Sequence, residues 1–263
     1  MQDLKVLALQ TDLLWEDPEG NRKVFENKIN HEFDDHDLII LPETFTTGFP
    51  VDPSYHAEPI DGKTIKWMKD ISSKFNCVLT GSVLLSKDDH YSNTLIWVLP
   101  DGSFQTYDKR HVFSMGGEHE KIRPGSEKIV VEYKGWKIRL MICYDLRFPV
   151  WSKNTYNEGF EYDLALYVAN WPAVRSYPWK TLLLARSIEN QAYMIGVNRV
   201  GKDGPGNMYS GDSMVVSPKG EIISQGKEGE EDTLNATLSY AELVRFRNKF
   251  NVGLDWDRFE IEY

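Results

Sequence analysis

The chain has 263 residues, of which 41% are hydrophobic, and this length is sufficient for one large α/β domain with a fully covered sheet. Its formal net charge of −10, from 40 acidic and 30 basic residues, disfavours nucleic acid and anionic membrane surfaces as partners. Residues 1–5 lead directly into a strand without a signal core, and no apolar run approaches the roughly 20 residues of a membrane helix. We therefore expect a soluble cytoplasmic protein.

Strand and helix signals alternate in the first half of the chain, which predicts an α/β layer fold. The helices are recognised by apolar residues at helical spacing, and the strands by short apolar runs. The expected order is strand, helix, strand, helix, strand, strand, at residues 4–10, 21–33, 38–41, 64–75, 77–85 and 94–99.

Turn signals in the second half indicate hairpins, so the sheet must be mixed rather than wholly parallel. The turns are at residues 100–103, 133–136 and 217–220, the later strands at 164–168 and 193–200, and the later helices at 178–190 and 240–250. Residues 201–207 are rich in glycine and are expected to form a flexible loop. No linker divides the chain, so residues 1–263 are predicted to form a single domain.

Cys143 ends the apolar run of residues 138–142 and is followed at once by a polar segment. A thiol at the tip of a buried strand, beside free backbone N–H groups, is placed like an activated nucleophile. The alternative is a buried cysteine that packs as a small hydrophobic residue. Cys77, within a predicted strand, is expected to be inert, and the two cysteines do not resemble a disulfide framework.

Glu43 and Lys109 also follow strand-like apolar runs. Because the carboxyl ends of strands gather at one edge of an open α/β sheet, these two side chains could meet Cys143 there. The alternatives are an acid at a helix start or in a loop for Glu43 and a surface charge for Lys109. The coincidence of all three favours a site with a base, a cation and a nucleophile.

Three segments carry a family resemblance. Residues 41–45 (Leu-Pro-Glu-Thr-Phe), 107–113 (Tyr-Asp-Lys-Arg-His-Val-Phe) and 141–149 (Met-Ile-Cys-Tyr-Asp-Leu-Arg-Phe-Pro) resemble, in order, the three catalytic motifs of the nitrilase superfamily of carbon-nitrogen hydrolases. The resemblance implies a four-layer α-β-β-α sandwich with mixed sheets. Residues 168–172 (Val-Ala-Asn-Trp-Pro) look most like the omega-amidases, which cleave the terminal amide of 2-oxoglutaramate and related acids.

Amide hydrolysis assigns a role to each of these side chains. Glu43 is the candidate base that deprotonates Cys143, whose free thiol has a pKa of about 8.5. The ammonium of Lys109 and the backbone N–H of Tyr144 could hold the oxyanion. The place of Glu118 is similar to that of the family's second glutamate, which orients substrate or lysine, although a solvated loop acid is the alternative.

Substrate contacts are expected from residues near the ends of the strands. Arg175 is the candidate anchor for a substrate carboxylate, with a surface charge as the alternative, whereas Arg147 is expected to have a structural role. Asn170 and Trp171 are candidate pocket walls. The side chains that could narrow the pocket are those of Phe45, Phe49, Phe113 and Met115.

Several alternative functions remain beside amide hydrolysis. Cys143 and His111 could form a protease-like dyad oriented by Asp145 or Asp108, and the chain could be a catalytically silent assembly or binding subunit. Amide, nitrile and carbamoyl substrates all stay open. No phosphate-binding loop or histidine pair with metal spacing occurs, so no cofactor and no metal are expected.

The C-terminal tail, from about residue 251, carries Trp256 and Phe259 after the last predicted helix. An apolar tail of this kind usually docks on another surface. The family resemblance implies a homodimer, and the partner subunit is a candidate surface for the tail.

Overall fold

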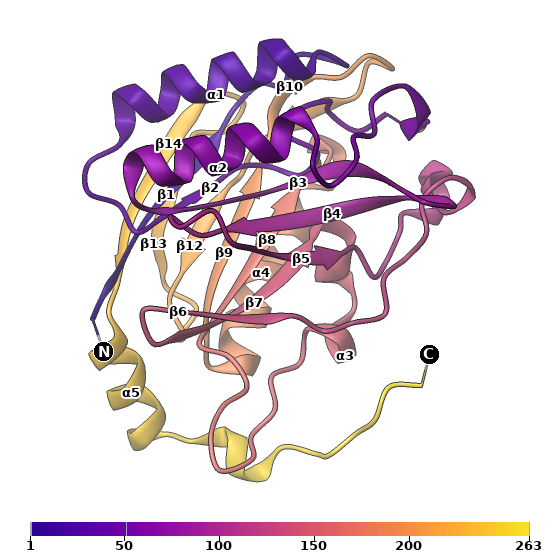
Figure 1. The fold of residues 1–263 in the computed structure, drawn as a ribbon. Coiled ribbons are helices and arrows are strands. Elements are labelled where there is room, and N and C mark those ends of the chain that lie inside the picture. Colours follow the sequence, from indigo (N-terminus) through magenta and orange to yellow (C-terminus); the bar gives the residue numbers. More distant parts are fainter. Residues whose placement is uncertain (1, 51, 263) are drawn as a thin grey trace.

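Two six-stranded mixed sheets pack face to face in the computed structural model, which describes residues 2–50 and 52–262 (Figure 1). The first sheet has the order β14-β1-β2-β3-β4-β5 and the second β13-β12-β9-β8-β7-β6. The strands of the first sheet are β1 (Leu4–Gln10), β2 (Leu38–Ile40), β3 (Val78–Lys87), β4 (His90–Val98), β5 (Phe104–Asp108) and β14 (Asp232–Leu238). Those of the second are β6 (Val130–Tyr133), β7 (Trp136–Ile142), β8 (Leu164–Ala169), β9 (Tyr193–Asn198), β12 (Met214–Val216) and β13 (Ile222–Gln225).

Each sheet has a parallel centre and antiparallel edges. In the first sheet β1, β2 and β3 run parallel, and in the second β7, β8 and β9 do so. The central strands β2 and β8 are buried along their whole length, as is typical of strands covered on both faces. The parallel strands place their carboxyl ends at one end of the sandwich, where Glu43, Cys143 and Asn170 follow β2, β7 and β8.

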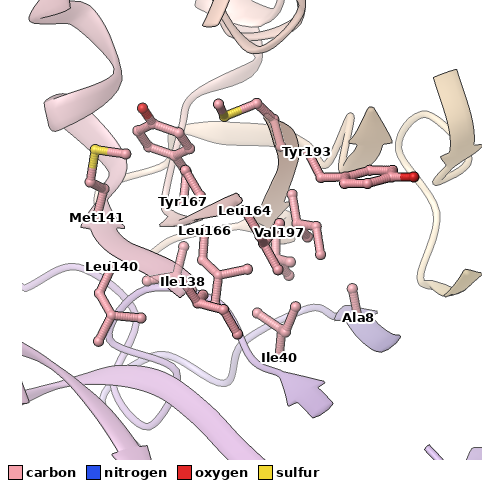
Figure 2. Close-up of a cluster of buried hydrophobic side chains, with 14 of the residues drawn as sticks. Ala8, Ile40, Ile138, Leu140, Met141, Leu164, Leu166, Tyr167, Tyr193 and Val197 are labelled. Atoms are coloured by element: carbon pink, nitrogen blue, oxygen red, sulfur yellow. The ribbon is translucent and has the colours of Figure 1, made fainter. Parts of the chain in front are cut away.

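Alternation along the strands divides the hydrophobic core into two parts. In β1, Val6 and Ala8 face the second sheet, whereas Leu7 and Leu9 belong to a separate cluster beneath the helices. Figure 2 shows the cluster between the sheets, where Ala8 and Ile40 of the first sheet lie opposite residues of β7, β8 and β9. Burial of both faces explains why the strands read as nearly continuous apolar runs.

Helices cover the outer faces of both sheets. Helices α1 (Pro18–Glu32) and α2 (Lys63–Phe75) lie on the first sheet, and α4 (Ser176–Asn190) contacts β9 and β12 of the second (Figure 1). Asp17 caps α1 by accepting a hydrogen bond from the Gly20 N–H at 2.9 Å. The four-layer α-β-β-α arrangement is therefore confirmed. The other α-helices of the described residues are the short α3 (Pro149–Ser152) and α5 (Tyr240–Lys249).

Two parts of the sequence prediction need correction. Residues 201–207 were expected to form a flexible loop, but β10 (Val200–Lys202) and β11 (Met208–Ser210) form a hairpin across this segment. Its turn is fixed by Asp203, whose carboxylate accepts hydrogen bonds from Asn207 and Tyr209. Strand β14 was not predicted at all, although it pairs with β1 along the full length of both strands.

The C-terminal tail lies against its own subunit. The Trp256 ring packs edge-on against Phe160 at 5.6 Å, and the Lys153 ammonium lies 3.6 Å from the centre of the Trp256 ring. Ile261 packs against the core between the sheets. Among the described residues, no helix is both long enough and apolar enough to cross a bilayer.

Candidate active site

Cys143 stands at a sharp turn directly after β7. Its backbone has φ = +44°, in the left-handed region that few residues other than glycine adopt, and a short 3₁₀ helix, Cys143–Arg147, begins there. The buried Asp145 carboxylate accepts the Ile142 N–H at 2.9 Å and so ties the turn to the strand end. The thiol, in a residue only 9% exposed, lies 3.9 Å from the Asn170 carbonyl oxygen. The turn therefore presents the sulfur at the carboxyl end of β7.

Lys109 is the centre of a buried charged cluster. Its Nζ donates to Glu43 Oε1 at 2.8 Å and to Glu118 Oε1 and Oε2 at 3.1 and 2.9 Å. All three side chains are almost fully buried. Glu118 is fixed further by the Phe113 N–H, which donates to Oε2. The structure thus brings together the three charged residues that the sequence predicted.

Burial and the neighbouring charges of opposite sign shift the pKa values of Lys109 and Glu118 in opposite directions. Burial alone would lower the pKa of Lys109, but the carboxylates of Glu118 and Glu43 outweigh it and raise the pKa above its ordinary value. Burial raises the pKa of Glu118, against the effect of the neighbouring Lys109. Burial and then the Glu43 charge raise the pKa of the Cys143 thiol well above its ordinary value. This shift favours the thiol form of Cys143, which would need a base before the sulfur could attack.

Asn170, at the carboxyl end of β8, connects Glu43 to the second sheet. Its backbone N–H donates to Glu43 Oε2 at 2.7 Å, and its side-chain amide donates to the Glu43 carbonyl oxygen at 2.7 Å. It also reaches the Thr44 hydroxyl at 2.9 Å. Sequence reasoning placed Asn170 in the pocket wall but missed this function of holding the Glu43 carboxylate.

A cavity of about 320 Å³ opens above the sulfur. Its wall includes eight residues that the sequence singled out, together with Arg147 and the β10–β11 hairpin. These residues are Phe49, Lys109, Phe113, Gly116, Cys143, Tyr144, Arg147, Asn170, Trp171, Pro172, Arg175, Asp203, Pro205, Asn207 and Tyr209. Phe45 and Met115 are not in the wall, because Phe45 packs in the core beneath the helices and Met115 is 81% exposed.

Two arginines of the wall lie over aromatic rings. The Arg147 guanidinium is 4.7 Å from the centre of the Trp171 ring, and that of Arg175 is 5.6 Å from the centre of the Phe113 ring. Across residues 2–50 and 52–262, neither has a carboxylate within ion-pair distance. The buried acid expected to pair with Arg147 is therefore not found among the described residues, and both arginines line the cavity.

His111 supports the turn that carries Cys143. Its Nδ1 and backbone N–H both contact Asp145 Oδ1, at 2.8 and 3.0 Å, and its ring stacks on Phe148 at 3.7 Å. The other Asp145 oxygen accepts from Tyr107 and from the Ile142 N–H. The Tyr107 hydroxyl comes from β5, the strand before Lys109, and the Ile142 N–H comes from the end of β7. Asp145 therefore links β5 to the turn that carries Cys143. No hydrogen bond joins His111 to the sulfur within the described chain.

The comparisons with known proteins agree with this geometry. A family model described as carbon-nitrogen hydrolase matches residues 6–248. The chain is 44% identical over 259 residues to the omega-amidase YafV of Yersinia enterocolitica, covering 98% of this chain and 99% of that relative. It is 31% identical over 250 residues to the 2-oxoglutaramate amidase of Bacillus subtilis, with 94% and 95% covered. A CN-hydrolase superfamily protein from Xanthomonas campestris, solved with an arsenic adduct in its active site, matches with a TM-score of 0.97 and 41% identity, and all of both chains is covered.

Proposed function

We propose that this chain, which belongs to the carbon-nitrogen hydrolase family, cleaves the terminal amide of a small 2-oxo dicarboxylic monoamide such as 2-oxoglutaramate. Hydrolysis of carbon–nitrogen bonds follows from the family and from the omega-amidase relatives. The choice of substrate is supported by one observation above all, namely that Arg147 and Arg175 share the cavity with Cys143 and lack carboxylate partners among the described residues. A protein with a net charge of −10 needs such local cations to attract an acidic substrate.

The first half of the proposed reaction forms a thioester. Glu43 removes the thiol proton of Cys143, and the sulfur attacks the amide carbon while the carbonyl π electrons move to oxygen. The ammonium of Lys109 and the backbone N–H of Tyr144 hold this oxyanion. Glu43 then gives its proton to the nitrogen, the carbon–nitrogen bond breaks, and ammonia leaves. Glu118 keeps the Lys109 ammonium in place through the contacts at 2.9 and 3.1 Å.

In the second half of the proposed reaction, a water molecule hydrolyses the thioester. Glu43 takes a proton from a water molecule, whose oxygen attacks the thioester carbon. Lys109 and the Tyr144 N–H hold the second oxyanion. The carbon–sulfur bond breaks, the sulfur of Cys143 regains its proton from Glu43, and the 2-oxo diacid leaves. One carboxylate thus serves both halves, which fits its position beside the thiol.

The proposed substrate is tested by neutralising the arginines. Arg175→Met should raise KM for 2-oxoglutaramate about tenfold or more, because one charge-assisted hydrogen bond is worth about 1.5 to 3 kcal/mol. KM for a neutral short amide should change little. Arg147→Met should likewise raise KM for 2-oxoglutaramate more than KM for the neutral amide. Arg245→Met, on the exposed face of α5, is the matched control and should change neither KM. Equal effects on charged and neutral amides, or a wild-type preference for a nitrile, would contradict the assignment.

We also propose that residues 1–263 act as one hydrolase domain, that the protein functions in the cytoplasm, and that two copies form a homodimer. The tail packs on its own subunit but leaves Leu254 71% exposed, and this side chain is a candidate contact with the partner.

A further inference from the structure

Asn93 is a buried amide of β4 that no part of the proposed mechanism uses. The residue is fully buried, and its carbonyl oxygen accepts the Lys109 N–H at 2.9 Å, so strand pairing fixes it beside the cluster. The neighbouring Ser92 and Thr94 bond to each other at 2.8 Å, as expected for side chains that share one face of a strand. The Asn93 side chain accordingly points to the opposite face, where Glu43, Lys109 and Glu118 meet.

The amide donates to both carboxylates of the cluster. Asn93 Nδ2 lies 2.8 Å from Glu43 Oε1 and 3.5 Å from Glu118 Oε1. The amino end of the Asn93 amide therefore faces Glu43, whose carboxyl oxygen accepts the hydrogen bond. This orientation of the amide lowers the folding stability, because Asn93 Oδ1 is buried without a hydrogen-bond partner among the described residues.

The contacts distinguish the two oxygens of Glu43. Oε1 accepts from Lys109 and from Asn93, both at 2.8 Å, whereas Oε2 accepts one N–H, that of Asn170, at 2.7 Å. A carboxylate oxygen has two lone pairs, so Oε1 is fully used and Oε2 retains one. By this count Oε2, and not Oε1, has a lone pair left for the proton of Cys143.

We propose that Asn93 is a positioning residue, which holds the Glu43 carboxylate so that its Oε2 atom, and not Oε1, exchanges the proton with the thiol and the substrate. This inference rests on the proposed function of Glu43. Asn93 is not part of the cavity wall, so it acts through Glu43 and does not contact substrate.

The experiment compares Asn93→Asp with Asn93→Ala. The aspartate variant keeps the volume but replaces the donor by an acceptor that faces two carboxylates, whereas the alanine variant removes the donor and leaves a small cavity. We expect kcat to fall about 10-fold in Asn93→Ala and about 100-fold or more in Asn93→Asp, with KM within about threefold of the wild type. Thermal unfolding followed by circular dichroism establishes that each variant is folded at the assay temperature.

Asn154 supplies a matched control, since it is a buried amide that donates to the carbonyls of Tyr162 and Asn190 in another part of the fold. Asn154→Ala should lower the unfolding temperature without lowering kcat. A packing role for Asn93 predicts the opposite ranking, in which alanine is worse than the isosteric aspartate, and this result would overturn the inference. So would unchanged kcat or a change confined to KM.

Glu43→Gln separates this inference from the function on which it rests. If Glu43→Gln retains wild-type kcat, the proposed mechanism fails. If Glu43→Gln is inactive while both Asn93 variants keep wild-type kcat, only the positioning role fails.

Discussion

Replacing Lys109 by methionine should damage both catalysis and stability. The change removes the cation that lies 2.8 Å from Glu43 and 2.9 Å from Glu118, and neither carboxylate has more than a few per cent of its surface exposed. Loss of one partner of a buried ion pair costs about 3 to 5 kcal/mol of unfolding free energy. Loss of an oxyanion donor lowers kcat roughly 10²-fold to 10³-fold. Urea unfolding and ammonia release measure the two effects.

The stability loss should depend on pH with a definite sign. Without the Lys109 ammonium, the pKa of Glu118, which burial already raises, rises further. The folded variant then binds more protons than the unfolded chain, so its free energy of unfolding increases as the pH falls from neutral toward the usual glutamate value of about 4.3. Adding Glu118→Gln removes one buried charge, and the double variant should be more stable at pH 7 than Lys109→Met alone.

Two results would refute this reasoning. One is a double variant that is less stable at pH 7 than Lys109→Met. The other is a larger loss of kcat in His111→Ala than in Lys109→Met, because His111 contacts Asp145 and should affect mainly stability or KM. That ranking would favour the protease-like dyad.

Three further predictions concern the cysteines and the assembly. Cys143→Ala should abolish ammonia release while circular dichroism shows an intact fold, since the lost sulfur borders an open cavity; more than residual activity would remove Cys143 as nucleophile. Burial raises the pKa of Cys77 to about 12 from an ordinary 9.0, so above pH 9 the unfolded chain loses a proton that the folded chain keeps and stability falls. In Cys77→Val, the free energy of unfolding measured with urea should fall less steeply between pH 9 and 12 than in the wild type. An unchanged slope against pH would contradict the raised pKa of Cys77. Light scattering should give the mass of a dimer, and a monomer at working concentration would exclude the proposed homodimer.

The sequence predicted that Glu43, Lys109 and Cys143 meet, because each follows a recognisable strand. The strands β2 and β7 lie in the parallel centres of their sheets and β5 runs in the same direction as β3, so the three positions lie at carboxyl ends of strands. Glu118 follows no strand and was predicted only from the family resemblance. Asn93 gives no such signal, because it lies within a strand and only the register of β4 against β5 places it beside Lys109. Its contact with Glu43 depends on tertiary packing, which a single sequence does not encode locally.

Arg147 and β14 were missed for different reasons. An arginine directly after a nucleophile turn can pair with a buried acid or face the cavity, and only the absence of an acidic partner in the described chain distinguishes the two. In β14, only two of the seven residues, Leu234 and Leu238, are buried, so the apolar run is weak. Pairing with β1, far away in sequence, makes it a strand.

The partnership of β1 with β14 has a consequence for synthesis of the protein. Leu4 lies opposite Leu238 and Gln10 opposite Asp232, so one edge of β1 has no partner while the intervening chain is translated. At about 5 to 20 residues per second, this interval is roughly 10 to 45 seconds. An apolar strand with an open edge can pair with other chains during that time. We expect the nascent chain to depend on early packing of α1 over β1, and ribosome-bound chains that stop before residue 232 to aggregate when released.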